Sequence, residues 1–361
     1  MSVSQLAENL VAYGGHKVTV YTTTANGKTE LDVIPNSTHQ LNGVNVTYFK
    51  RLTKDHSHLS PKLYKALWQN INQFDIIHLH AWWHLVSVGS ALICILKNKT
   101  FIVSPRGTLS NYSFNNKTTF IKKVFHKFIS TPILLKASFL LTSKKEEDDL
   151  KLLLKTPKET FVLPNFVKMA SSKLKLPQPD FKVFKLLFLS RIEEKKGLAF
   201  LFEALQHCKI PYTLIIAGTG EPVYVEKLKL LAQKLNIQKN IIWLGQVNTD
   251  YKFEVLNQHH LLVLPSYDEN FANVVIESLS VGTAVLITQN VGLSDFVLEH
   301  NLGWICSQKP EDIKSKIEYI FTQTQQLKNI KATTPSLIAT VFNAQNLTVN
   351  YVKYYETTLG N

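Results

Sequence analysis

Residues 261–282 read LLVLPSYDENFANVVIESLSVG, and this stretch carries the pattern that decides the fold. The four apolar residues Leu261–Leu264 predict a buried strand, which ends at the turn residues Pro265–Asp268. The mostly apolar run that follows predicts the start of a helix. Because a strand, a turn and a helix in this order form part of a βαβ unit, the stretch indicates a parallel sheet.

Glu269 and Glu277 lie eight positions apart in this stretch, just over two helical turns. Both carboxylates can therefore share one face of a helix, and the simplest interpretation is that solvent covers that face. The alternative is a ligand site. The residues around Glu277 are apolar, so its carboxylate is costly there unless something binds it. The backbone N–H groups of residues 270–273 also follow the carboxyl end of a strand, where open α/β sheets bind ligands.

Apolar, β-branched runs alternate with helix-length segments along most of the chain, which indicates an α/β fold with parallel sheets. We expect two doubly wound domains, 1–166 and 184–335, that face each other across a cleft. The segment 167–183 has two prolines and no apolar strand, so it is the expected linker. A helical tail, 336–361, is expected to pack back across it. The predicted strands lie within residues 16–22, 74–81, 100–107, 137–143, 160–165, 184–191, 212–220, 240–247, 261–266 and 283–288.

The beginning of the chain departs from this plan. Residues 4–13 predict a helix that ends at Gly14 and Gly15, and the first predicted strand comes after it. A doubly wound domain normally opens with a strand and a glycine-rich turn before that helix. Either the true start lies upstream, or this chain has an incomplete site.

The composition is that of a globular protein. The 361 residues are 45% hydrophobic and 19% charged. No apolar run reaches the roughly 18 to 20 residues that a membrane span needs. The three cysteines have no metal-like or redox-like spacing, so we expect core thiols in a reducing cytoplasm.

The net charge of +13 belongs to the first half of the chain, because residues 1–170 carry +11 and residues 171–361 carry +2. Within that half, residues 118–130 read TTFIKKVFHKFIS and alternate apolar and basic residues at helical spacing. Such a helix either packs its apolar face on its own sheet or lies on an anionic membrane. A nucleic-acid partner is not expected, since no nucleic-acid-binding motif accompanies the charge.

Several motifs resemble those of the retaining glycosyltransferases of family 4, and the resemblance covers nearly the whole chain. The strongest are PSYDENFANVVIESLSVGTAVLIT and LSRIEEKKGLAFLFEAL, with IIAGTGE and WLGQV in weaker support. In the first half, DIIHLHAWW, SPRGTLS, LLTSKKEED and LPNF are similar to successive family blocks, and the SPRGTLS form suggests the branch that builds bacterial surface polysaccharides. The resemblance implies the GT-B fold and transfer of a sugar from a nucleotide diphosphate donor, without metal or cofactor.

Site residues follow from the resemblance in the second domain. It implies that Glu277 holds the donor ribose, and that Glu269 lies near the donor sugar as a catalytic group. Other residues are implied to bind the donor or its diphosphate, for which cations are suitable. They are Arg191, Lys196, Gly218, Phe271 and Ala272. Ala272 stands where the family often has glycine, which limits how closely the backbone approaches a sugar.

Fewer candidates come from the first domain. Arg106 follows a strand, and we expect it to contact the acceptor or the donor phosphate as a second catalytic group. His80 also ends a strand and is either a cleft residue or a hydrogen-bonded core histidine. Of the adjacent Trp82 and Trp83, one is expected to be core. The acidic run Glu146–Asp149 is interpreted as a solvated helix start.

Together these features predict a metal-independent glycosyltransferase of polysaccharide or lipopolysaccharide biosynthesis. Its expected donor is a UDP- or GDP-sugar, and its expected acceptor is a lipid-linked glycan. The expected location is the cytoplasm, at the inner face of the plasma membrane. The alternative is a non-catalytic protein that binds a nucleotide-sugar, because the opening loop is missing. An oxidoreductase fits less well, since no G-x-G-x-x-G follows a predicted strand.

Overall fold

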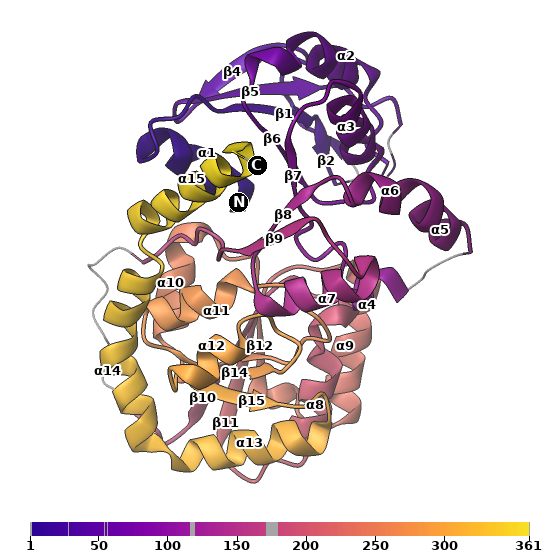
Figure 1. Cartoon of the computed structure of the whole chain (residues 1–361). Coiled ribbons are helices and arrows are strands. Elements are labelled where there is room, and N and C mark those ends of the chain that lie inside the picture. The colour runs from indigo at the N-terminus through magenta and orange to yellow at the C-terminus, as the bar shows by residue number, and fades with distance from the viewer. Residues whose placement is uncertain are drawn as a thin grey trace. The chain divides into compact units, whose positions relative to one another are not determined.

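The computed structural model describes residues 2–27, 29–53, 55, 57–115, 120–170 and 180–360. The chain divides into two units. The first unit consists of residues 1–166 and 344–361, and the second of residues 167–343. Both have the α/β construction that the alternating apolar runs predict (Figure 1). The expected linker falls largely on residues 171–179, which lie outside the described residues.

The second unit contains a six-stranded sheet in the order β12-β11-β10-β13-β14-β15, and all of its strand pairs are parallel. In chain order within the unit this is 3-2-1-4-5-6, the arrangement of a dinucleotide-binding Rossmann fold. The strand order reverses between β10 and β13, and ligands of such sheets bind beside that point. The strands are β10 (Phe184–Leu189), β11 (Tyr212–Ala217), β12 (Ile241–Gly245), β13 (Leu261–Leu264), β14 (Ala284–Thr288) and β15 (Gly303–Cys306).

Helices cover this sheet in two groups. In the first, α8 contacts α9 and α13; in the second, α11 contacts α10 and α14. Every residue of β13 and β14 is buried, as expected for strands with helices on both faces. The helices are α8 (Leu198–Gln206), α9 (Pro222–Lys234), α10 (Thr249–Asn257), α11 (Asn273–Ser280), α12 (Ser294–Glu299), α13 (Pro310–Thr322) and α14 (Thr324–Val341), with short 3₁₀ turns η3 (Glu194–Lys196) and η4 (Gln238–Asn240).

The strands of the first unit form two larger sheets and one small hairpin. One sheet has the order β1-β5-β4, and the other is the fully parallel β6-β7-β8-β9. The strands are β1 (Thr19–Thr23), β2 (Ala25–Asn26), β3 (Thr29–Glu30), β4 (Thr38–Leu41), β5 (Val44–Phe49), β6 (Ile77–His80), β7 (Phe101–Ser104), β8 (Ser138–Leu141) and β9 (Glu159–Val162). The first element among the described residues is a helix, α1 (Ser2–Ala12).

The last helix of the chain, α15 (Ala344–Gly360), belongs to the first unit and lies beside α1 (Figure 1). Its Leu347, Tyr351 and Tyr354 share a buried cluster with Ile102 of β7 and Leu140 of β8. The remaining helices of this unit are α2 (Pro61–Asn70), η1 (Ile71–Gln73), α3 (Leu85–Leu96), α4 (Asn111–Asn115), α5 (Phe120–Phe125), the π-helix η2 (His126–Ser130), α6 (Thr131–Leu134) and α7 (Lys144–Leu154).

The predicted strands are all present, and sequence reasoning missed several others. The unpredicted ones are β2, β3, β4, β5 and β15. The cysteines are free thiols, with Cys94 and Cys306 buried and Cys208 partly buried. Burial raises the pKa of each thiol to about 12, which makes all three poor nucleophiles.

Gly218 provides a test of how closely the loop after β10 and the loop after β11 must approach each other. Its φ is 145°, and a Cβ there would lie 1.9 Å from the carbonyl oxygen of Ser190. We expect Gly218→Ala to lower the free energy of unfolding in urea well beyond the cost of backbone strain. Gly245→Ala is the control, because Gly245 has φ 73° and no described atom near its would-be Cβ. It should cost only about 1–2 kcal/mol of left-handed strain. Equal losses for the two variants would contradict the close approach.

Candidate active site

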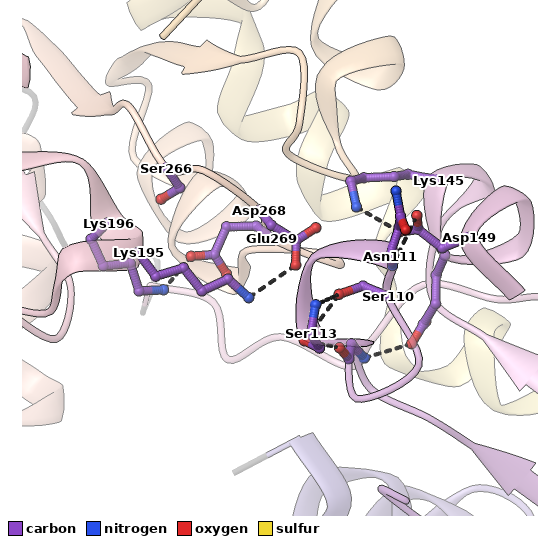
Figure 2. Close-up of polar contacts among 12 residues, drawn as sticks. Ser110, Asn111, Ser113, Lys145, Asp149, Lys195, Lys196, Ser266, Asp268 and Glu269 are labelled. Atoms are coloured by element: carbon purple, nitrogen blue, oxygen red, sulfur yellow. Dashed lines mark hydrogen bonds and ion pairs between the residues drawn. The ribbon is translucent and has the colours of Figure 1, made fainter. Parts of the chain in front are cut away.

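The turn after β13 brings two acidic residues against two lysines of η3 (Figure 2). The Nζ of Lys195 lies 3.0 Å from Oδ2 of Asp268, and Lys196 pairs with Glu269. The Lys196 and Asp268 side chains are buried, with 10% and 4% of their surface exposed. The backbone joins them as well, since the N–H of Tyr267 donates to the carbonyl of Lys195 over 2.8 Å. The turn after β10 and the turn after β13 are therefore fixed to each other at the switch point of the sheet.

Glu269 is not on the helix that carries Glu277, so the expectation of one shared helix face is wrong. Helix α11 begins at Asn273, and Glu269 lies in the loop before it. That loop pairs with the segment after β14. The Glu269 N–H donates to Asn290 O over 3.0 Å, and the Gly292 N–H donates to Glu269 O over 2.9 Å. The Glu269 carboxylate is therefore held by its own backbone as well as by Lys196.

Glu277 lies on α11 and is buried, with 8% of its surface exposed, so the interpretation of a solvated helix face is wrong. The group that satisfies its carboxylate in the structure is Lys252 of α10, whose Nζ lies 2.6 Å from Oε1. Sequence reasoning missed Lys252. No local signal marks it, because the contact depends on the packing of α10 against α11 and not on the spacing of residues within either helix.

The two proposed diphosphate-binding cations differ in their surroundings. Lys196 is a buried residue, with 8% of its surface exposed. Arg191 follows β10, and its side chain is 77% exposed with Glu193 at 3.2 Å. It is therefore free to move onto an anion. Gly197 follows Lys196 with φ 71°, and a Cβ there would lie 2.0 Å from Pro265 O, so the lysine turn needs glycine at this point.

The remaining residues predicted in this unit contribute backbone more than side chains. The Phe271 side chain is 1% exposed and belongs to the core. Ala272 precedes α11 with φ 69°, the left-handed conformation that glycine adopts more easily. Gly218 lies at the end of β11, where its N–H donates to Gly245 O over 2.7 Å.

In the first unit, the structure brings Arg106 and His80 together. The Arg106 Nε lies 3.4 Å from His80 Nδ1, and its Nη1 bonds to Asn165 Oδ1. Burial, then His78 and Arg106, hold the pKa of His80 well below its usual value, so this histidine is neutral. His80 is thus a partner of Arg106. Asn165 was not predicted as a site residue.

Trp82 is the core tryptophan, fully buried with its Nε1 donating to Ser130 Oγ over 2.7 Å. The interpretation of the acidic run Glu146–Asp149 as a solvated helix start is wrong for Glu146, because this residue is only 4% exposed. Its carboxylate accepts hydrogen bonds from the N–H groups of Gly107 and Thr142, each 2.8 Å long. Asn111, the first residue of α4, also contacts α7, because the Asp149 carboxylate accepts from the Asn111 N–H and from Lys145 (Figure 2).

Comparison with known proteins identifies this arrangement. The family described as "Glycosyltransferase Family 4" matches residues 1–170, and "Glycosyl transferases group 1" matches residues 175–336. The chain belongs to this glycosyltransferase family. It is therefore a retaining glycosyltransferase that transfers a sugar from a nucleotide-sugar, with two Rossmann-like units of the GT-B type.

Two relatives and one solved structure are similar to this chain. An uncharacterized glycosyltransferase of Methanocaldococcus jannaschii is 24% identical over 88% of this chain and 83% of its own length. The N-acetylgalactosamine-N,N'-diacetylbacillosaminyl-diphospho-undecaprenol 4-alpha-N-acetylgalactosaminyltransferase of Campylobacter jejuni is 28% identical over 54% of this chain and 52% of its own. The structure of Anabaena Alr3699/HepE in complex with UDP and glucose has a TM-score of 0.74, with 17% identity over 99% of this chain and 96% of that one.

The Lys252–Glu277 pair can be tested by removing one charge and then both. Lys252→Met should lower the free energy of unfolding by about 3 kcal/mol, because it leaves a buried carboxylate without its cation. Combining it with Glu277→Gln should restore most of that loss, since no buried charge then remains. Urea unfolding of the two variants measures both values. A double variant that is less stable than Lys252→Met would show that Lys252 is not the main partner of the Glu277 carboxylate.

Proposed function

We propose that the second unit binds a nucleoside diphosphate-sugar at the carboxyl ends of β10 and β13. Glu277 accepts hydrogen bonds from the ribose hydroxyls. Lys196 and Arg191 bind the diphosphate, and Glu269 lies beside the sugar with the backbone N–H groups of residues 271 and 272. The observation that carries this proposal is the burial of Lys196 and Glu277, with Glu269 paired to Lys196, beside the switch point of a 3-2-1-4-5-6 sheet.

These residues suit the chemistry of sugar transfer. When the bond between the sugar and the diphosphate breaks, negative charge grows on the leaving diphosphate, and the lysine and arginine cations stabilise it. Lys196 is held in place before the reaction by Glu269, so little reorganisation accompanies the charge shift. Glu269 in turn carries a negative charge next to the anomeric carbon, where positive charge develops.

UDP is the nucleotide that we favour for the donor, with GDP as the other choice. The UDP in the Alr3699/HepE complexes supports it, because that protein shares the fold over nearly the whole chain. For the acceptor we propose a lipid-linked glycan of surface polysaccharide or lipopolysaccharide. The diphospho-undecaprenol in the name of the Campylobacter jejuni relative supports this class. Arg106 is the proposed contact with the acceptor in the first unit.

A membrane surface is supported by the outer side of α5 and η2. Their apolar residues were expected to pack on the sheet or to meet lipid, and most of them are exposed to solvent. Phe120 is 80% and Phe128 is 66% exposed, and Val124 and Ile129 are also exposed, whereas Phe125 packs against the core. Lys123 and Lys127 lie exposed among them. A cationic and apolar helix surface fits an anionic membrane.

The other two basic residues of this segment face inwards. Lys122 donates to Ser113 O over 2.9 Å, and its Nζ lies 4.6 Å from the ring centroid of Trp83. His126 is 7% exposed and lies against Phe114. The exposed surface of Phe120, Lys123, Val124, Lys127, Phe128 and Ile129 is therefore the proposed membrane-binding surface.

Among the described residues, no helix has both the length and the apolar character that a membrane crossing requires. The proposed location is the inner face of the plasma membrane.

The donor-binding role of Glu277 is tested best in the stabilised double variant Lys252→Met, Glu277→Gln. If the carboxylate binds ribose, the dissociation constant of UDP should rise by about 10- to 100-fold, the loss of a charge-assisted hydrogen bond. Isothermal titration calorimetry measures it, with GDP in parallel. Glu254→Gln, an exposed change on α10, is the control. A double variant that binds UDP like the control would remove the ribose role.

The membrane-binding surface is tested with vesicles of phosphatidylcholine and phosphatidylglycerol. Lys123→Ser with Lys127→Ser should weaken binding about thirtyfold at low salt, at about 1 kcal/mol for each lysine. Phe120→Ser with Phe128→Ser should weaken binding to the same vesicles at every salt concentration. The matched control is Lys227→Ser with Lys234→Ser, which removes the same charge from exposed positions of α9. Equal losses for the two lysine pairs would contradict a defined surface.

A further inference from the structure

Arg106 lies in a strained turn. Its φ is 53° and that of Gly107 is 80°, and the Thr108 N–H donates to Pro105 O over 3.1 Å. Two consecutive positive φ values with this hydrogen bond describe a type I′ turn, which favours small residues and not arginine. A left-handed arginine costs about 1–2 kcal/mol. Such a conformation persists only when its surroundings hold it, and strained residues cluster at functional sites.

One set of contacts reaches Arg106 through β6. His78 and His80 point to the same face of the strand, and their rings lie 4.1 Å apart with a tilt of 39°. His78 Nδ1 lies 2.9 Å from the hydroxyl of Tyr355 on α15. Its Nε2 lies 2.8 Å from Ser104 Oγ. His80, beside it, faces the Arg106 Nε.

The donor and the acceptor of each hydrogen bond around His78 can be assigned. Ser104 Oγ donates its only hydrogen to Leu140 O over 2.7 Å, so it accepts from His78 Nε2. His78 Nδ1 then carries no hydrogen and accepts from Tyr355. Burial and the charge of Arg106 lower the pKa of His78 to about 3, in agreement with this neutral tautomer. Tyr355 is therefore a donor that fixes the ring of His78, and through it the ring of His80.

A second set of contacts reaches Arg106 from the same helix. The Tyr351 hydroxyl donates to Pro164 O over 3.0 Å, and its ring lies 5.0 Å from that of Phe166. Between these two residues is Asn165, whose Oδ1 accepts from Arg106 Nη1. Tyr351 and Tyr355 are one helical turn apart, so α15 contacts residues next to both partners of the guanidinium: His78 beside His80, and Pro164 and Phe166 on either side of Asn165.

We propose that Tyr351 and Tyr355 of the C-terminal helix are positioning residues for Arg106, acting through Asn165 and through His78 and His80. The inference rests on the proposed function in one respect, since it is the transfer reaction that needs Arg106 in a fixed place. The Arg106 geometry itself can be tested without substrate.

Arginine Nε–H exchange measures the geometry directly. The chain has three arginines, so a sample with ¹⁵N-labelled arginine gives three Nε–H signals in an NMR spectrum. Arg51 Nε is bonded to Glu30, and Arg191 is exposed, so both serve as internal references. The Arg106 signal, assigned with Arg106→Lys, should exchange with water more slowly than that of Arg191. In Tyr355→Phe or Tyr351→Phe its exchange should accelerate about five- to tenfold, in line with the loss of one hydrogen bond.

Tyr354→Phe is the matched control. Tyr354 lies on the same helix and is 1% exposed, but its hydroxyl has no hydrogen-bond partner among the described residues. Removing this hydroxyl should leave the Arg106 signal unchanged. If the Arg106 Nε–H exchanges at the same rate in Tyr351→Phe, Tyr355→Phe and Tyr354→Phe, the proposal is wrong. Because Tyr351 and Tyr355 act on different partners, either variant alone tests the proposal if the other does not fold.

Turnover separates this proposal from the proposed function. With UDP-glucose as the probe, kcat for UDP release should fall about five- to tenfold in Tyr355→Phe and stay unchanged in Tyr354→Phe, the loss expected for one hydrogen bond. The dissociation constant of UDP should not change in either. Faster Arg106 exchange with full turnover would overturn the positioning role. A wild-type protein that releases no UDP would count against the proposed donor, and the NMR result would still decide the geometry.

Discussion

Two lysine–glutamate pairs, whose four side chains are each only 10–13% exposed, are the constraint on which the second unit depends. Taking four charges out of water costs several kcal/mol for each ion, unless each charge meets an opposite one at hydrogen-bonding distance. Lys196 with Glu269 and Lys252 with Glu277 meet this condition, and each pair joins two segments that are distant in the sequence. The pairs therefore define where η3, the loop after β13, α10 and α11 lie. They also leave cations and carboxylates at the edge of the sheet where we propose that the diphosphate and the sugar of the donor bind.

The first unit applies the same principle to a single arginine. The turn of Arg106 is unfavourable by itself, and buried polar groups from β6, α7, α15 and the segment after β9 hold it. Most of these groups are neutral, so they fix the guanidinium without cancelling its charge. An arginine whose side chain is fixed in one conformation while its charge is not neutralised is suited to an anionic partner. In each unit, therefore, the polar groups follow the carboxyl ends of parallel strands, and the core beneath them is apolar.

The strands could be predicted where they form continuous apolar runs, as in Leu261–Leu264. β5 was missed because Asn45 and Thr47 interrupt its apolar run, and β15 because a four-residue run that begins with glycine gives little signal. The residue types of the candidate site follow from the family motifs. Their partners do not, since Lys252 is one of many lysines, and only the packing of α10 on α11 selects it. Tyr355 was missed for the same reason, because its contact with His78 joins residues that are 277 positions apart.

The most direct test of the central claim is a crystal structure with UDP bound. We expect the ribose hydroxyls to lie within hydrogen-bonding distance of the Glu277 carboxylate, with the diphosphate against Lys196 and Arg191. A nucleotide bound elsewhere, with Glu277 still in contact with Lys252 alone, would contradict it.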